Sequence, residues 1–224
     1  MTDYLDDKDY CSWSSLIRTG DLFGADFLYH KIPEQLYPID NGAFLRNTTE
    51  FHSVVTDCRT GAAEYLQVKD MFADVDAVRA SASLPLVSRM VQINGTPYLD
   101  GGIVDPIPVV QALNDGCDKA VVILTRHRDY RKGKEFSVPL MRLKYRKYPA
   151  LVQAIEKRPQ TYNETLARLS VLEQEGRVFV IAPEEPLAIR RTEKDRDVLR
   201  KGYEAGASLA RLQMSQLEKF ISES

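Results

Sequence analysis

The chain has 224 residues, of which 44% are hydrophobic and 28% are charged, and its formal net charge is −2. These values are typical of a globular protein with one substantial core, and the slightly acidic balance argues against a protein built to bind nucleic acid. The three cysteines, Cys11, Cys58 and Cys117, include no Cys-x-x-Cys pair. Their odd number and wide spacing disfavour a zinc site or a disulfide framework and favour a reducing compartment.

The first fifty residues are acidic at their start and are then interrupted by glycine and proline. Residues 1–9 contain no apolar run, so we expect neither a signal peptide nor a membrane anchor there. No stretch approaches the roughly 20 apolar residues that a membrane-spanning helix needs. We predict short helices and loops up to residue 50 and a cytoplasmic protein.

Two β-hairpins are predicted in the middle of the chain. The first joins a strand at 51–57, rich in valine and threonine, to a strand at 64–68. The second joins 90–93 to 96–99 through an Asn-Gly dipeptide, which is typical of two-residue hairpin turns.

Capping residues, prolines and glycines predict four helices after residue 70. They run from Asp74 to about Ser83, from Pro106 with Asp105 as its cap to Asp115, from Pro159 to Gln174, and from Thr192 to near the end of the sequence. The last helix has an apolar face at spacings of three and four, formed by Leu199, Tyr203, Ala207, Ala210, Met214, Leu217 and Ile221.

Two further strands, at 119–125 and 177–182, are continuously apolar rather than alternating. Such strands are typical of a parallel sheet that helices cover on both faces. With the helices between them, they predict a single α/β domain over residues 1–224.

The strongest candidate for chemistry follows the second hairpin. Its strand ends in Asp100, and Gly101 and Gly102 come next. Two glycines allow positive φ angles and a close approach to another group, so the carboxylate would stand at the end of a strand with no bulky neighbour after it. Reactive acids are often placed this way, although a tight structural turn has the same pattern.

The surrounding motifs, taken in order, resemble those of the patatin-like phospholipases. They are Thr56-Asp57 ahead of a Thr60-Gly61 turn, the run from Ala80 to Val87, Tyr98-Leu99-Asp100-Gly101-Gly102, Asp105-Pro106-Ile107-Pro108, and the strand ending at Leu124-Thr125-Arg126. The resemblance implies a three-layer α/β/α sandwich with a mostly parallel central sheet. It also implies a lipid acyl hydrolase in which a serine in a Gly-x-Ser-x-Gly elbow attacks an ester, Asp100 is its base, and no histidine takes part.

Neither that elbow nor the upstream glycine-rich loop that forms the oxyanion hole in this family occurs in these 224 residues. The chain therefore resembles the C-terminal part of a patatin domain, truncated on its N-terminal side, and we expect the serine upstream of residue 1. By itself the chain is expected not to hydrolyse esters. The alternative is a catalytically inactive patatin-like interaction module.

A serine hydroxyl needs a base to become a nucleophile, and a free aspartate, with a pKa of about 3.9, is a weak one. Burial beside apolar residues such as Leu99 and Ile103 would strengthen it. His127 offers another hypothesis, because α/β-hydrolases place serine, acid and histidine in that chain order. Ser81 and Ser83 lack a glycine elbow and are interpreted as small packing residues.

The stretch 126–147 carries nine lysines and arginines against two acids, with aromatic and aliphatic residues between them. This pattern suits peripheral contact with an anionic membrane, a lid over an acyl pocket, or simply a solvated surface. The remaining histidines, His30 and His52, have no partner pattern. Because no cluster of ligand residues stands out, we expect no metal and no organic cofactor.

Overall fold

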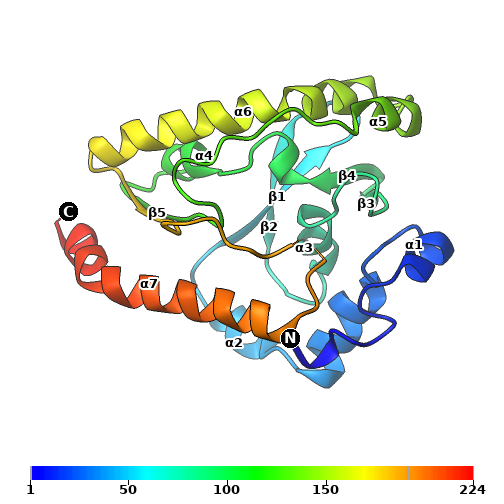
Figure 1. Cartoon of the computed structure of the whole chain (residues 1–224), viewed down its shortest axis with the longest axis horizontal. Helices are drawn as coiled ribbons and strands as arrows, with labels where there is room; N and C mark the ends of the chain where they lie inside the picture. Colours follow the sequence, from blue (N-terminus) through cyan, green and yellow to red (C-terminus); the bar gives the residue numbers. More distant parts are fainter. Residues whose placement is uncertain (1, 191, 224) are drawn as a thin grey trace. The chain divides into compact units, whose positions relative to one another are not determined.

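The computed structural model describes residues 2–190 and 192–223, and Figure 1 shows their course. The chain divides into two compact units. The hairpin unit comprises Asp3–Pro106 and Lys134–Thr161, and the parallel-strand unit comprises Ile107–Gly133 and the chain from Tyr162 onward. Each unit combines separate segments of the chain, and the division between them falls inside helix α6 (Pro149–Gln174). The single domain predicted over residues 1–224 therefore stays a prediction.

A four-stranded antiparallel sheet organises the hairpin unit, with the strand order β2-β1-β4-β3. Its strands are β1 (Phe51–Asp57), β2 (Ala63–Val68), β3 (Val91–Ile93) and β4 (Thr96–Asp100). Both predicted hairpins are confirmed. At the second turn Asn94 and Gly95 have φ angles of 50° and 78°, which is the backbone that an Asn-Gly hairpin requires.

Short helices precede the sheet, as the glycines and prolines predict. They are η1 (Thr2–Tyr4), α1 (Trp13–Thr19), the π-helical segment η2 (Phe27–Leu36) and α2 (Asn41–Arg46). Helix α1 begins where the Ser12 side chain accepts a hydrogen bond from the Ser15 backbone, and it ends at Gly20, whose φ is 82°.

Helix α3 (Val75–Ser81) lies against the sheet and buries alanines at Ala77 and Ala80. Asp74 does not cap it as predicted. Its carboxylate instead accepts hydrogen bonds from the backbone N–H groups of Lys69 and Asp70, which closes the turn before the helix. Local turn geometry therefore competes successfully with helix capping for the same side chain.

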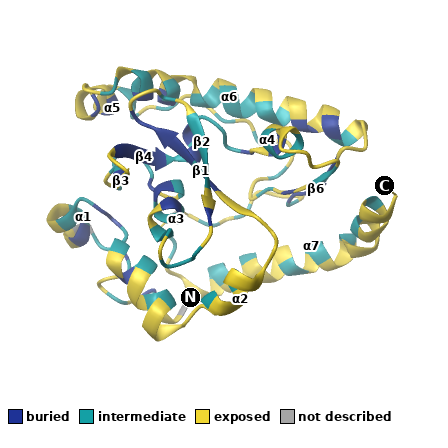
Figure 2. Ribbon diagram, turned by 180° about the vertical axis from the view of Figure 1, so that it is seen from behind, coloured by how far each residue is buried: buried dark blue, intermediate teal, exposed yellow. Residues whose placement is uncertain are grey.

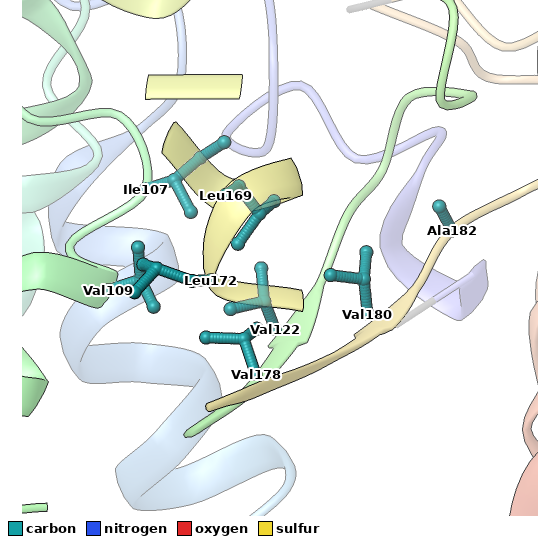
Figure 3. Close-up of a cluster of buried hydrophobic side chains, with 8 residues drawn as sticks. All are labelled: Ile107, Val109, Val122, Leu169, Leu172, Val178, Val180 and Ala182. Carbon is teal, nitrogen blue, oxygen red and sulfur yellow. The ribbon is translucent and has the colours of Figure 1, made fainter. Parts of the chain in front are cut away.

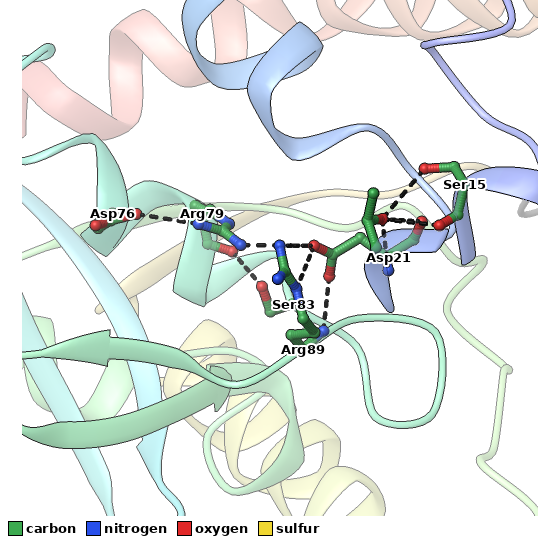
Figure 4. A network of polar contacts seen from close by, with 7 residues as sticks. Ser15, Asp21, Asp76, Arg79, Ser83 and Arg89 are labelled. Carbon is green, nitrogen blue, oxygen red and sulfur yellow. Dashed lines mark hydrogen bonds and ion pairs between the residues drawn. The ribbon is translucent and has the colours of Figure 1, made fainter. Parts of the chain in front are cut away.

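An ion network around Asp21 fixes the N-terminal segment to the rest of the hairpin unit (Figure 4). The buried Asp21 carboxylate accepts hydrogen bonds from the Arg89 backbone at 2.7 Å and its Nε at 3.0 Å, and Arg79 Nη2 lies 3.6 Å away. Two cations and a backbone donor offset the cost of burying the carboxylate.

The larger apolar cluster of the hairpin unit joins the sheet to α5 (Val138–Lys144) and to the first half of α6 (Pro149–Gln174). Its buried members are Cys58, Leu99, Ile103, Met141, Tyr145, Leu151 and Ile155. The predicted start of this helix at Pro159 is wrong by ten residues, because Pro159 lies inside α6. An interior proline costs a helix about 3 kcal/mol, and the burial of Leu151 and Ile155 on its N-terminal side offsets that cost.

The parallel-strand unit contains β5 (Ala120–Ile123) paired in parallel with β6 (Val178–Ile181), and α4 (Val109–Asn114). One face of this sheet packs on α4 and on α6, where Val122, Leu169, Leu172 and Val180 form a buried cluster (Figure 3). The opposite face of β5 is open, because Val121 is 42% and Ile123 is 73% exposed.

The prediction of an α/β fold is confirmed, and the prediction of a mostly parallel central sheet covered on both faces is wrong for the described residues. Their four-stranded sheet is antiparallel, and the parallel part has two strands. Helices α4 and α6 cover one face of this small sheet, and α7 (Arg196–Ser222) covers the other face only at β6, where Phe220 packs on Phe179. Short turns such as Asn94-Gly95 can only connect antiparallel neighbours, so the hairpin sequences account for the β1–β2 and β3–β4 pairs. The antiparallel β1–β4 pair joins the two hairpins and depends on tertiary packing.

Helix α7 (Arg196–Ser222) begins at Asp195 rather than at Thr192, since the Asp195 carboxylate accepts hydrogen bonds from the backbone of Asp197 and Val198. Its predicted apolar face is only partly covered (Figure 2). Leu199, Ala207, Ala210 and Leu217 are half-buried, whereas Tyr203, Met214 and Ile221 are exposed. Among the described residues, no helix has the length and apolarity to cross a membrane.

Candidate active site

The backbone of Asp100 is fixed from three directions. The residue pairs with Val55 across the sheet, its N–H donates to the Ser83 carbonyl at 2.9 Å, and its carbonyl accepts from the Thr56 hydroxyl at 2.8 Å. The predicted position of the acid at the end of a strand is correct, and the surrounding contacts hold it there.

The Asp100 carboxylate also closes the turn that follows. Its Oδ1 accepts a hydrogen bond from the Gly102 N–H at 2.7 Å and so caps the short 3₁₀ helix η3 (Gly101–Ile103). Leu99 and Ile103, the apolar neighbours named from the sequence, are fully buried, while Asp100 itself is half-buried. The side chain therefore combines a turn-capping role with access from solvent.

Both glycines of the motif are needed because a side chain would collide with neighbouring atoms. The prediction of positive φ angles is therefore wrong, and the prediction of a close approach to another group is confirmed. Neither residue has a positive φ. A Cβ on Gly101 would collide with the Val54 carbonyl. A Cβ on Gly102 would stand 3.0 Å from Asp100 Oδ1 and 3.7 Å from Arg158 Nη2.

The helix predicted from Pro106 begins only at Val109, because η3 comes first and the chain after it remains irregular. Asp105 does not cap that helix. Its carboxylate instead accepts a hydrogen bond from the Tyr65 hydroxyl at 2.5 Å, which ties the loop after the motif to strand β2.

Arg158 of α6 is the residue at this turn that the sequence did not indicate. Its Nε donates to the Gly102 carbonyl at 2.8 Å, although the two residues lie 56 positions apart. Gly102 is thus fixed at its N–H by Asp100 and at its carbonyl by Arg158. No local pattern marks such a contact, because it depends on how α6 packs on the turn.

The Thr56-Asp57 motif has a structural function here. Asp57 is buried and accepts a hydrogen bond from the Arg59 backbone at 2.7 Å, while Arg59 Nη2 donates to the Thr96 hydroxyl at 2.6 Å. Burial, with a smaller contribution from the Asp57 charge, raises the pKa of the Cys58 thiol to about 12. These contacts join the two hairpins, and Cys58 is an inert core residue.

Tyr29 lies within the electrostatic field of the candidate base. Burial raises the pKa of the Tyr29 phenol, the Arg79 charge opposes this, and the charges of Asp100 and Asp21 add to the increase.

The other sequence candidates lie in ordinary environments. Ser83 is buried and its hydroxyl donates to the Arg79 carbonyl at 2.8 Å, which agrees with a packing role. His127 belongs to the parallel-strand unit, where its ring contacts Tyr130 edge-on, so its pairing with Asp100 stays an untested hypothesis. His30 lies beside Glu34, and the described residues contain no group of three potential metal ligands.

Comparison with known proteins finds two family models that match this chain. Residues 8–113, which include the Asp-Gly-Gly turn, match the family model described as Patatin-like phospholipase. The resemblance inferred from the motifs is thereby confirmed. Residues 148–222 match a second model, described as a domain of unknown function (DUF6363).

One similar protein is the uncharacterized protein YjjU of Escherichia coli strain K12. It is 26% identical to this chain over 226 residues, an alignment that covers 98% of the chain. The chain spans 62% of the length of that relative. Both family matches thus fall within a sequence that aligns almost throughout with part of a longer protein.

Proposed function

We propose that this chain is the base-bearing part of a lipid acyl hydrolase that uses a Ser-Asp dyad, with Asp100 as the general base. The single observation that carries the proposal is the Asp-Gly-Gly turn, whose carboxylate stands at the end of β4 between fully buried neighbours and lies within the patatin match. The match to the patatin-like model supports a phospholipase or esterase activity, and the fixed backbone of Asp100 supports a defined geometry for its carboxylate.

The nucleophile in this proposal lies upstream of residue 1. No Gly-x-Ser-x-Gly sequence occurs in the 224 residues, and the chain covers 62% of a longer relative. The serine oxygen would attack the ester carbonyl carbon while Asp100 accepts the hydroxyl proton. That proton would then pass to the leaving alcohol, and Asp100 would next accept a proton from the water that hydrolyses the acyl-enzyme.

Comparing Asp100→Asn with His127→Ala tests this proposal in the full-length protein. Asparagine preserves the shape and the acceptor for the Gly102 N–H but cannot take the serine proton, so kcat should fall by about 10⁴ or more. His127→Ala should remain within a few-fold of the wild type, with thermal unfolding recorded for both variants.

A comparable loss in His127→Ala, with the fold intact, would replace the dyad with a histidine triad. A well-folded full-length protein without ester hydrolysis would instead favour the alternative, a catalytically inactive interaction module.

We further propose that the protein is cytoplasmic and contacts anionic membranes through the hairpin-unit part of the basic stretch. The part before residue 134 belongs to the parallel-strand unit, where Arg128 forms a bidentate ion pair with Glu173 at 2.7 and 2.9 Å. Helix α5 buries Met141 and Tyr145, whereas Phe136, Leu140 and Leu143 are exposed at spacings of four and three. Exposed basic residues surround them: Lys134, Arg142, Lys144, Arg146 and Lys147.

Co-sedimentation with vesicles tests this contact. The protein should bind vesicles that contain phosphatidylserine more strongly than those of phosphatidylcholine alone, because each basic residue near an anionic surface contributes about 1 kcal/mol. Replacing Phe136, Leu140 and Leu143 with serine should abolish sedimentation. The matched control is Leu212→Ser on α7, which removes a residue that is 80% exposed outside this surface. Equal binding by both variants would contradict the proposal.

A further inference from the structure

Gly102 is the point where the candidate base and a cation from a distant helix meet. Its N–H donates to Asp100 Oδ1 at 2.7 Å, and its carbonyl accepts from Arg158 Nε at 2.8 Å. The two charged side chains thus form hydrogen bonds with the same residue, one with its N–H and the other with its carbonyl. Hydrogen bonds that involve a charged group are about twice as strong as neutral ones, so these two hydrogen bonds restrict the backbone of the turn.

The absence of a side chain at Gly102 brings the two charged groups near each other. A Cβ there would have Asp100 Oδ1 at 3.0 Å and Arg158 Nη2 at 3.7 Å as neighbours. Any other residue would therefore crowd the carboxylate and come into contact with the guanidinium. The second glycine of the motif provides room for both side chains, which explains why it is needed without a positive φ.

Burial supports a fixed position for Arg158. The side chain is half-buried on α6. Ile155 and Leu151, one and two turns earlier on the same helix, are almost completely buried in the cluster that also contains Leu99 and Ile103. The strand that leads into the Asp-Gly-Gly turn, the turn itself and this part of α6 therefore share one apolar core. A displacement of Arg158 would require the core to repack.

We infer that Arg158 is a positioning residue for the proposed dyad: it orients the Asp100 carboxylate through Gly102. This inference rests on the proposed function for its consequence in catalysis, although the contact itself does not. It also assigns a role to the start of the segment that matches the domain of unknown function, since residue 158 lies within 148–222. That segment would complete the active site of the patatin-like part.

Kinetics of the full-length protein test the catalytic consequence. Arg158→Gln should lower kcat by about 10-fold to 100-fold with KM nearly unchanged, because a small misplacement of a catalytic group is costly. Arg158→Lys should recover part of the loss, since it restores the charge without the planar geometry. The matched control is Arg177→Gln in the parallel-strand unit, which removes an Nε-to-carbonyl hydrogen bond of the same length, 2.8 Å to Asp118, and should leave kcat unchanged.

An NMR measurement on the 224-residue chain tests the contact independently of any activity. In wild type the Gly102 amide should be protected from hydrogen exchange by Asp100, and Arg158→Gln should reduce that protection by at least about tenfold while the thermal melt remains cooperative. Arg177→Gln should not change it. Unchanged Gly102 protection in Arg158→Gln would overturn the inference, as would a rise in KM with kcat intact. An inactive wild type with the expected NMR result would refute only the proposed function.

Discussion

The two units differ in how their strands are supported. The hairpin unit packs its sheet against α3, α5 and α6, and its polar turns are joined by side chains such as Asp57, Arg59 and Arg158. The parallel-strand unit has two strands, of which β5 leaves Val121 and Ile123 exposed. An apolar sequence alone does not show whether other elements cover both faces of a strand. Specific side-chain contacts, in contrast, fix the turns of the hairpin unit, including the turn that follows Asp100.

The largest contrast between the units should appear in thiol reactivity. Cys58 is buried in the hairpin unit with a pKa raised to about 12, whereas Cys117 of the parallel-strand unit is exposed. Because the thiolate is the reactive form, labelling of native Cys58 by a disulfide reagent at pH 8 should be at least about 10³ slower than that of Cys117. Mass spectrometry of the labelled peptides provides the rates, with guanidinium-unfolded protein as the control. Similar rates for the two native thiols would contradict the packing of the hairpin core.

Glycine substitutions should have opposite effects in the two units. Gly101→Ala places a Cβ against the Val54 carbonyl and should lower the free energy of unfolding by about 3 kcal/mol. Gly206→Ala, on α7, has no atom within 4 Å of the new Cβ and should stabilise the helix by about 0.5–1 kcal/mol. Urea unfolding of both variants measures the difference, and a harmless Gly101→Ala would show that the turn is not closely packed.

Adjacent residues of β5 provide the smallest contrast, within one strand. Val122 points into the cluster with Leu169 and Val180, so Val122→Ala should cost about 2 kcal/mol. Ile123 is 73% exposed, and Ile123→Ala should change the free energy of unfolding by less than about 0.5 kcal/mol. If both variants lose similar stability in urea, the second face of β5 is covered in solution, as the continuous apolar sequence predicted.

The sequence predicted those parts of the fold that short-range rules determine. Both hairpins, the position of Asp100 and the short N-terminal helices follow from residues within a few positions of each other. Long-range competition explains the errors: Asp74 and Asp105 bind other partners instead of capping helices, and α6 extends ten residues before Pro159. Arg158 could not be found at all, because its contact with Gly102 depends on tertiary packing.

Labelling of the full-length protein with a serine-reactive fluorophosphonate tests the central claim most directly, with the site of labelling mapped by mass spectrometry. The Ser-Asp dyad predicts one labelled serine, within a Gly-x-Ser-x-Gly sequence upstream of residue 1, and a labelling rate reduced at least about 100-fold in Asp100→Asn. Labelling of a serine within these 224 residues, such as Ser83, or a rate that Asp100→Asn leaves unchanged, would contradict the assignment of Asp100 as the base.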